Sequence, residues 1–321
     1  MSEIVCIDSR IGQRYAIYNG DSCEVLPQFP ERSADLVVYS PPFSDLYVYS
    51  DSERDMGNST QQEFETHYRH LLASLFRVLR PGRLCAVHCM DLPSRKSVEG
   101  WMGLRDFSGD LIRMHTAAGF HYLSRITIWK DPVTQMQRSK AHNLLYKNIQ
   151  EDTTRNYAGL PDYILLFRRP VLDGEDGATV KVKQTPETFS LDQWQQWASP
   201  VWPVDWSEIP ETWQDPVWMD VDQQDTLNGE RGRREARGED DEKHICPLQL
   251  PTIRRLVKMY TNPGEVVLSP FLGIGSEGYV SLQEGRRFIG VELKGSYFRT
   301  AAKNLDSIEN VRQTSLFGGG K

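Results

Sequence analysis

The sequence predicts an α/β protein with a doubly wound, mostly parallel sheet, helices on its faces and an irregular insert. Three observations support this fold: apolar strand-like runs alternate with helical spacing, a glycine turn joins two of the runs, and 321 residues suit one large domain plus an insert. Lys and Arg number 37 against 44 Asp and Glu, a net charge of −7. This balance argues against a surface that is basic throughout, although it leaves room for a local basic cleft.

The first two strands are expected at residues 15–18 (YAIY) and 35–39 (DLVVY), because both runs are apolar and rich in aromatic or β-branched side chains. Asp21 follows the first strand, where an acid commonly serves as a turn residue or a helix N-cap. After the second strand, the polar segment 44–59 is typical of a loop over the strand ends.

The second strand stops in a tetrapeptide of one hydroxyl, two prolines and one aromatic ring: Ser40, Pro41, Pro42 and Phe43. The prolines stiffen the chain into an elbow that presents the hydroxyl, backbone carbonyls and the ring. This set suits a planar amino group, with acceptors for its N–H donors and a ring to stack on its base. An ordinary strand exit with a packed Phe43 explains the tetrapeptide equally well.

Helices and strands then continue to alternate: helices at 61–80 and 106–118, and strands at 83–88, 123–129 and 162–167. Pro81 and Gly82 are expected to separate the first helix from the strand that follows it. His88 and His121 end or flank these elements, and we interpret both as structural rather than catalytic.

Residues 264–292 predict a βαβ unit: a strand at 266–268, a glycine turn at 269–275, a helix at 276–284 and a strand at 288–291 that ends on Glu292. Glycines let the backbone approach a ligand closely, and a carboxylate accepts hydrogen bonds from ribose hydroxyls. The unit therefore predicts a nucleoside site. Because the turn is not G-x-G-x-x-G, a dinucleotide is not the expected ligand.

The tetrapeptide and the glycine turn together resemble two motifs of the DNA amino-methyltransferases, which use S-adenosylmethionine. These motifs are S/D/N-P-P-Y/F/W and D-P-F-x-G-x-G, and the tetrad stands first here, as in the family's β group. The resemblance covers about residues 14–170 and 241–306. It implies a Rossmann-like class I methyltransferase fold in three segments: a catalytic half at 1–170, an inserted Trp-rich acidic region and flexible loop at 171–240 as candidate target-recognition region, and a cofactor-binding half at 241–321.

The resemblance also implies roles for individual residues. It places Ser40, Pro41, Pro42 and Phe43 in catalysis, and it places nine residues at the cofactor: Asp21, Ser269, Pro270, Phe271, Gly273, Gly275, Glu292, Lys243 and His244. Ser269 stands where the family usually has Asp, which leaves open how the amino group of the methionine moiety is held. Ser40 in place of Asp favours N4 of cytosine over N6 of adenine, because Ser is commoner in the N4 enzymes.

The expected reaction transfers a methyl group from S-adenosylmethionine to the exocyclic amino group of a base flipped out of DNA. Ser40 and the Pro41 carbonyl would accept the two amino hydrogens, and Phe43 would stack on the base. Carbon-5 methylation would need an activated thiol, which the family resemblance places in a Pro-Cys dipeptide that this sequence lacks. Two alternatives stay open: an amino-methyltransferase that acts on RNA or protein glutamine, and a catalytically silent DNA-binding module.

Double-stranded DNA is the expected partner, and four basic residues between the last two catalytic-half strands are candidate phosphate contacts: Arg138, Lys140, Lys147 and Arg155. A solvated surface explains these charges equally well. A cognate restriction endonuclease and a second copy of the chain are further partners to consider. No apolar run reaches the roughly 18 residues of a membrane span, so we expect a cytoplasmic protein encoded by a bacterium or phage.

The five cysteines are scattered, and without a second pair at ligand spacing they predict buried reduced thiols and no metal site. Residues 171–225 hold six tryptophans and twelve acids against two lysines. We interpret these tryptophans mainly as a small core that holds the insert together.

Overall fold

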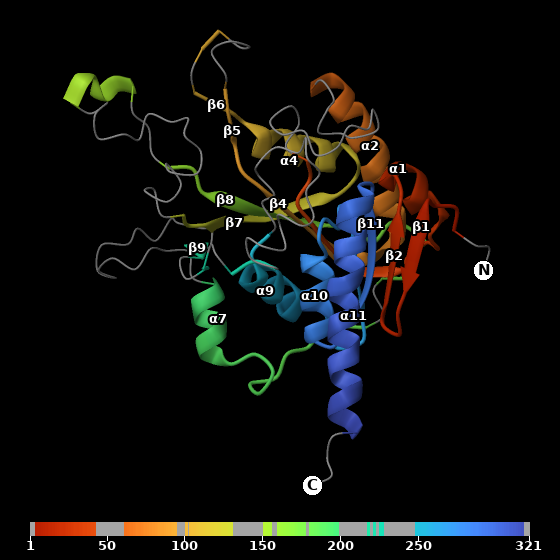
Figure 1. Cartoon of the computed structure of the whole chain (residues 1–321). Coiled ribbons are helices and arrows are strands. Elements are labelled where there is room, and N and C mark those ends of the chain that lie inside the picture. Colours follow the sequence, from red (N-terminus) through yellow and green to blue (C-terminus); the bar gives the residue numbers. More distant parts are fainter. Residues whose placement is uncertain are drawn as a thin grey trace.

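Figure 1 shows the fold as a computed structural model, which describes residues 4–42, 61–94, 100–101, 103–130, 150–155, 159–177, 180–198, 217–218, 221–222, 225–227 and 248–317. A nine-stranded sheet runs through its centre in the order β1-β2-β11-β10-β3-β4-β8-β7-β9. Its strands are β1 (Asp8–Ile11), β2 (Tyr15–Asn19), β3 (Ala34–Tyr39), β4 (Leu79–Cys89), β7 (His121–Ile128), β8 (Asp162–Arg168), β9 (Val217–Trp218), β10 (Val266–Ser269) and β11 (Arg287–Glu292).

The α-helices are α1 (Ser22–Val25), α2 (Gln61–Val78), α4 (Phe107–Ala117), α7 (Leu191–Ala198), α9 (Leu250–Tyr260), α10 (Ser276–Gln283) and α11 (Gly295–Phe317). Short 3₁₀ turns form η1 (Leu26–Gln28) and η4 (Thr153–Arg155), and β5 (Leu92–Pro93) pairs with β6 (Leu104–Arg105) in a separate ribbon. Local signals set several boundaries. For example, α4 begins after Asp106, whose carboxylate accepts the Gly109 N–H at 2.8 Å, and ends near Gly119 at φ +96°.

The middle of the sheet is parallel, from β2 through β11, β10 and β3 to β4. β8 runs antiparallel to both β4 and β7, and β1 is antiparallel to β2. Every residue of β3 is buried, which is expected for a central parallel strand with both faces covered. The prediction of a doubly wound, mostly parallel α/β fold is therefore confirmed.

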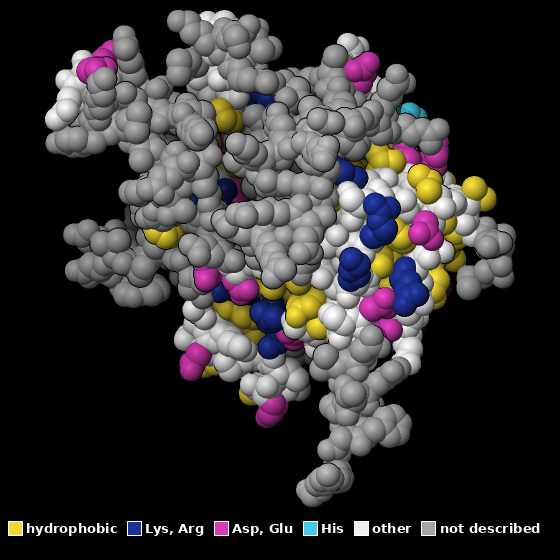
Figure 2. Space-filling model, viewed as in Figure 1, with side chains coloured by type: hydrophobic (Ala, Val, Ile, Leu, Met, Phe, Trp, Pro, Cys, Tyr) yellow, Lys and Arg dark blue, Asp and Glu magenta, His cyan; other side chains and the backbone are white. Residues whose placement is uncertain are grey.

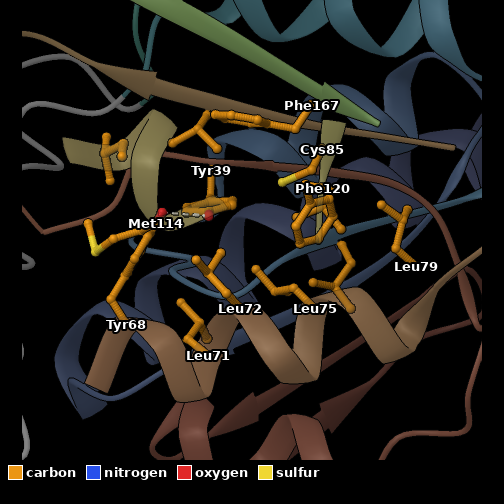
Figure 3. Close-up of a cluster of buried hydrophobic side chains, with 14 of the residues drawn as sticks. Tyr39, Tyr68, Leu71, Leu72, Leu75, Leu79, Cys85, Met114, Phe120 and Phe167 are labelled. Carbon is orange, nitrogen blue, oxygen red and sulfur yellow. Dashed lines mark hydrogen bonds between the residues drawn. The ribbon is translucent and has the colours of Figure 1, made fainter. Parts of the chain in front are cut away.

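Two hydrophobic cores cover the two faces of the sheet. On one face Val37 and Tyr39 of β3 pack with leucines of α2 and with α4, and Figure 3 shows Leu71, Leu72 and Leu75 pointing from α2 toward this core. On the other face Leu36 and Val38 pack with α9, α10 and α11. Side chains alternate along β3 because successive residues of a strand point to opposite faces.

The chain reverses its winding between β10 and β3, which are parallel neighbours with Leu268 opposite Val37. From β10 it passes through α10 to β11 on one side, and from β3 it passes through α2 to β4 on the other. Such a switch point opens a crevice at the carboxyl ends of the strands, where α/β proteins bind ligands.

The predicted strands and helices are present with small shifts at their ends, but one boundary was wrong. Pro81 and Gly82 do not separate helix from strand, because β4 already begins at Leu79 and includes both residues. Gly82 takes φ +78° and donates its N–H to the Arg169 carbonyl at 2.8 Å. The pairing register with β3 shifts at this point, so the strand passes the proline through an irregularity.

Of the six tryptophans predicted to form a small core in the insert, the structure describes the side chains of Trp194 and Trp197 only, and these two differ. Trp197 in α7 is buried against Phe189, with ring centroids 5.0 Å apart, and Arg255 lies over its ring. Trp194 on the same helix is 53% exposed, so it does not join a core. The division of the chain into three segments stays a prediction.

Surface charge is mixed over the described part of the face in Figure 2, where acidic and basic side chains lie interspersed. Arg10 and Asp306 form an ion pair, with Nη2 and Oδ2 2.9 Å apart. Cys85 and Cys89 are buried free thiols, as expected, whereas the free thiols Cys6 and Cys23 are only partly buried. None of the described helices is long and apolar enough to cross a membrane.

Candidate active site at the switch point

Five parallel strands end at one edge of the sheet and bring the predicted site residues together. β3 ends just before Ser40, β10 ends at Ser269, and β11 ends at Glu292 opposite Asn19 of β2. The tetrad strand and the glycine turn, more than 200 residues apart in the chain, are therefore neighbours. The Tyr39 and Phe271 rings, with centroids 5.8 Å apart, make direct contact across this junction.

Backbone hydrogen bonds within the loop after β10, and to β11, give the loop its shape. Leu272 N–H donates to the Val291 carbonyl and Gly275 N–H to the Leu272 carbonyl, each at 2.9 Å. Gly273 takes φ +55° and Gly275 φ +94°, the left-handed region that favours glycine. A Cβ on Gly275 would press on Ala301 at 3.2 Å, whereas a Cβ on Gly273 would meet no described atom within 4 Å. The loop thus keeps one open side, at Gly273.

Glu292 ties this loop to the end of β11. Its Oε2 accepts the Gly273 N–H at 2.7 Å, and its Oε1 accepts the Lys294 N–H at 2.9 Å. A carboxylate can accept about four hydrogen bonds, so Glu292 can hold the loop and still accept a donor from a ligand.

Three polar side chains are buried at the glycine turn and in the helix that follows it, and two of them lack a described partner. The hydroxyls of Ser269 and Ser276 are buried without a hydrogen-bond partner in the described part of the chain. Glu277, in the first turn of α10, is also buried. Burial raises the pKa of its carboxyl to about 8, and the charge of Glu292 adds to the rise. Unpaired polar groups in a native interior call for an explanation such as a ligand.

Asp21 lies where it can serve both as a helix N-cap and as a residue at the cofactor, the two roles that the sequence suggested. It is the N-cap of α1, where Oδ1 accepts the Cys23 N–H at 2.8 Å. The next residue, Ser22, donates its hydroxyl to the Pro270 carbonyl and so joins this turn to the cofactor loop. Asp21 thus caps a helix next to the loop, and a role at the cofactor stays a prediction.

Ser40 contacts His88 on the neighbouring strand. Its Oγ lies 3.1 Å from Nδ1 of His88 and 3.4 Å from the His88 carbonyl oxygen. The register explains this contact, because Tyr39 pairs with Val87 and the next residues of the two strands are neighbours. On the other side of the ring, Nε2 lies 3.2 Å from Oδ2 of Asp162.

Asp162 reaches this edge because β8 is antiparallel and therefore begins where β3 and β4 end. Lys130, just beyond β7, places Nζ 2.5 Å from Oδ1 of Asp162. Burial alone would raise the pKa of the Asp162 carboxyl, but the charge of Lys130 and the contact with His88 outweigh it and lower the pKa to about 2. Asp162 is therefore a buried, ionised carboxylate.

A second polar cluster lies under the end of β3. Tyr39 Oη is 2.7 Å from Tyr68 Oη, the dashed line in Figure 3, and 3.2 Å from Nε2 of His115. His115 is fully buried, stacks on Phe167 at 4.0 Å and donates from Nδ1 to the Leu111 carbonyl. Burial lowers the pKa of His115 to about 4, so the ring is neutral near pH 7.

Some predicted residues lie outside the part that the structure describes: Phe43, Arg138, Lys140, Lys147, Lys243 and His244. Arg155 ends the short turn η4, and we assign its side chain no contact. The remaining predicted residues, Asp21, Ser40, Pro41, Pro42, Ser269, Pro270, Phe271, Gly273, Gly275 and Glu292, lie at or next to the carboxyl ends of β2, β3, β10 and β11.

The sequence interpretation missed three residues of this region: His88, Asp162 and Lys130. His88 was interpreted as structural, yet its ring contacts the tetrad hydroxyl. The one sequence signal for His88 was its place at the end of a predicted strand, where α/β proteins bind ligands. Asp162 required knowledge that β8 runs backward, which a strand pattern does not reveal.

Comparisons with known proteins agree with this geometry. A family model described as DNA methylase matches residues 34–303. The type II methyltransferase M.BglII of Bacillus subtilis is 24% identical over 301 residues, which cover 90% of this chain and 68% of that enzyme. M.BglI of Bacillus subtilis is 28% identical over 188 residues, which cover 58% of this chain and 39% of that enzyme.

Two solved structures share the fold. TTHA0409 of Thermus thermophilus, a candidate DNA modification methylase complexed with S-adenosyl-L-methionine, matches with a TM-score of 0.58 and 23% identity, covering 91% of this chain and 93% of that one. The cytosine-N4-specific PvuII DNA methyltransferase matches with a TM-score of 0.58 and 18% identity, covering 95% and 94%.

Proposed function

Since this chain belongs to the DNA methylase family, whose enzymes use S-adenosylmethionine, we propose that it methylates the exocyclic amino group of a flipped base in double-stranded DNA, with N4 of cytosine favoured over N6 of adenine. The observation that carries the proposal is the meeting of the Ser40 strand end with the 269–275 loop at the switch point. The preference for cytosine rests on Ser40 at the head of the tetrad, the residue that resembles the N4 enzymes.

The residues at the end of β10 fit the cofactor. The hydroxyls of Ser269 and Ser276, which have no partner among the described residues, are buried polar groups that a bound ligand could satisfy, and the open side of Gly273 lets the backbone approach the ligand. The Glu292 carboxylate, at the end of β11, can accept hydrogen bonds from ribose hydroxyls. We assign the cofactor to these residues and to Asp21, Pro270, Phe271 and Gly275, while Lys243 and His244 stay predictions from the sequence.

When bound, S-adenosylmethionine supplies an electrophilic methyl group. The base amino nitrogen is a poor nucleophile because its lone pair is delocalised into the ring. Ser40 Oγ and the Pro41 carbonyl would accept its two hydrogens and stabilise the charge that develops on the nitrogen. Holding both reactants at neighbouring strand ends supplies the remaining acceleration. Phe43 would stack on the base, and Arg138, Lys140, Lys147 and Arg155 would contact phosphates.

Ser40→Ala tests the proposal against a matched serine at the end of the adjacent strand. Ser40→Ala should lower the rate of methyl transfer about 10²–10³-fold, the usual scale for one preorganised polar partner, and leave cofactor affinity unchanged. Ser269→Ala should instead weaken cofactor binding, because its hydroxyl lies in the cofactor loop. Rates come from labelled methyl incorporation, and affinities come from calorimetry.

The substrate class is tested by offering DNA, RNA and protein to the enzyme in parallel, followed by nucleoside analysis of the methylated product. Labelled N4-methylcytosine in DNA supports the proposal in full, whereas N6-methyladenine corrects the base. Methyl incorporation into RNA or protein alone, or full activity of Ser40→Ala, would overturn it.

A further inference from the structure

Ser40 is one end of a chain of polar side chains contributed by four adjoining strands and their ends. Ser40 Oγ meets Nδ1 of His88 at 3.1 Å, Nε2 of His88 faces Asp162 at 3.2 Å, and Asp162 meets Lys130 at 2.5 Å. His88 and Asp162 are both buried, with 7% and 3% of their surfaces exposed. We propose that this chain makes Ser40 a proton acceptor for the amino group, so that His88 receives, through Ser40, the proton that methylation releases.

The partners decide which ring nitrogen carries hydrogen. An ionised carboxylate only accepts hydrogen bonds, and Asp162 is held ionised by Lys130. The nitrogen facing Asp162, Nε2, is therefore the protonated one. Nε2 lies 3.2 Å from Oδ2 of Asp162 and has no hydrogen-bond partner within the described part of the chain, so the attraction to Asp162 is mainly electrostatic. Nδ1 is then left with a lone pair that points at Ser40.

This tautomer determines what Ser40 can do. A hydroxyl has one hydrogen to donate and two lone pairs to accept. With its hydrogen directed to Nδ1 at 3.1 Å, in preference to the His88 carbonyl at 3.4 Å, Ser40 presents lone pairs to the amino group. With the opposite tautomer, the ring would donate to Ser40 and occupy one of those lone pairs.

The chain also gives the surplus proton a destination, and this step rests on the proposed function. As the methyl carbon leaves sulfur, the C–S electron pair stays on sulfur, and the nitrogen lone pair forms the new C–N bond. The nitrogen is then cationic and must lose one hydrogen as a proton. Ser40 Oγ takes that proton while its own hydroxyl proton passes to Nδ1, and Asp162 stabilises the imidazolium that results. His88 thus acts through Ser40 as a positioning residue.

A double-mutant cycle separates this role from a structural one. His88→Asn keeps a small polar group on β4 but cannot take up a proton. It should lower the rate of methyl transfer about 10²-fold, the scale of general-base catalysis, with little change in the KM for DNA or in cofactor affinity. If His88 acts through Ser40, the Ser40→Ala/His88→Asn double variant should be no slower than Ser40→Ala.

The control is His115→Asn, which removes a buried imidazole that contacts Tyr39 instead of Ser40. This variant should lose stability, yet its effect on the rate should multiply with that of Ser40→Ala. A fully active His88→Asn, or His88 and Ser40 effects that multiply, would overturn the chain while leaving the proposed function intact. A wild-type protein that methylates no DNA would instead overturn the proposed function and the chain with it.

A second measurement requires neither turnover nor a stable variant. Nitrogen NMR of histidine-labelled protein without cofactor should show His88 protonated on Nε2 and bare on Nδ1, and Ser40→Ala should shift the Nδ1 signal. A His88 ring protonated on Nδ1 in the neutral form would overturn the proposal.

Discussion

The loop after β10 and the hydroxyl after β3 lie side by side at one edge of the sheet, yet they are held in different ways. The loop is shaped by backbone hydrogen bonds and by glycines at positive φ, and the side chains of Glu292, Ser22 and Asn304 bond to its backbone groups. Ser40 is held by side chains, through His88, Asp162 and Lys130, above the buried Tyr39–Tyr68–His115 cluster.

The difference predicts opposite sensitivities to pH. Around Ser40, two of the buried titratable groups are a neutral His115 and an ionised Asp162, both with pKa values below their ordinary range. Next to the loop, the buried group is Glu277, with a pKa above its ordinary range. Low pH should therefore destabilise the fold through the groups around Ser40, and high pH should destabilise it through Glu277 next to the loop.

The largest expected effect is that of Glu277. Its pKa is raised from 4.5 to about 8, so the folded state binds more protons than the unfolded state between these values. Stability from the protonated carboxyl is present below pH 4.5 and is lost as pH rises through 8, roughly 3–5 kcal/mol over the whole window. Glu277→Gln should remove this slope in urea unfolding and be more stable than the parent at pH 8.

Glu284→Gln, at the other end of α10, is the matched control and should keep the parental slope. If Glu277→Gln leaves the pH dependence of unfolding unchanged, Glu277 is not the group that makes the loop side sensitive to alkali.

The second effect is acid lability through His115. Its pKa is lowered from 6.5 to about 4, so the unfolded state binds more protons between these values. Stability falls as pH drops from about 6.5 to about 4, by about 3 kcal/mol in total. His115→Gln should flatten this part of the curve even if the variant is less stable overall, whereas the exposed His121→Gln should not. Equal slopes for both variants would contradict the prediction.

Below pH 4 the parent should lose further stability as Asp162 is protonated, because its lowered pKa places that loss between about 4 and 2. Stability would then be lost in two stages as the pH falls, first through His115 and then through Asp162. Unfolding curves measured at half-unit pH steps can resolve the two stages.

The same contrast explains what the sequence could predict. The glycine turn, with Gly273 and Gly275, and the acid Glu292 follow one another within a single βαβ unit, so their spacing in the chain already describes the loop. Ser40 and its prolines were visible as a strand exit. His88 and Asp162 were not visible as partners, because their contact depends on the pairing of β4 with the reversed strand β8. The end of β4 and the start of β8 are 73 residues apart in the chain (162 − 89 = 73).

Boundaries failed for a related reason. Pro81 and Gly82 are helix-stop signals in the sequence, but pairing of Leu79 with Ala34 begins the strand before them. Trp194 and Trp197 lie on one short helix. Among the described residues, Trp197 packs against Phe189 and Arg255, whereas Trp194 is exposed. Local pattern predicts that an element exists, while contacts from distant segments decide where it ends and which side is buried.

A further prediction compares two glutamates that each accept two backbone N–H groups at opposite ends of β2. Glu292 holds Gly273 and Lys294 at the candidate site, and Glu309 holds Gln13 and Arg14 at the far edge, at 2.9 and 2.7 Å. Both alanine variants should lose stability. Only Glu292→Ala should weaken S-adenosylmethionine binding, by roughly 1–3 kcal/mol in calorimetry. Unchanged affinity would remove Glu292 from the site.

The smallest expected effect isolates the open side of the loop. Gly273 at φ +55° and Gly264 at φ +81° both require a left-handed backbone, and a Cβ at either position meets no described atom within 4 Å. Each Gly→Ala change should therefore cost a similar amount of stability, about 1–2 kcal/mol from the backbone alone.

The two glycines differ in where they lie. Gly264 precedes β10 at the opposite edge, whereas Gly273 donates its N–H to Glu292 at 2.7 Å. If the open space beside Gly273 belongs to the cofactor, Gly273→Ala should also reduce S-adenosylmethionine affinity about tenfold or more, a loss of about 1.4 kcal/mol, and Gly264→Ala should not. Equal affinities in the two variants would mean that the cofactor approaches the loop from another side.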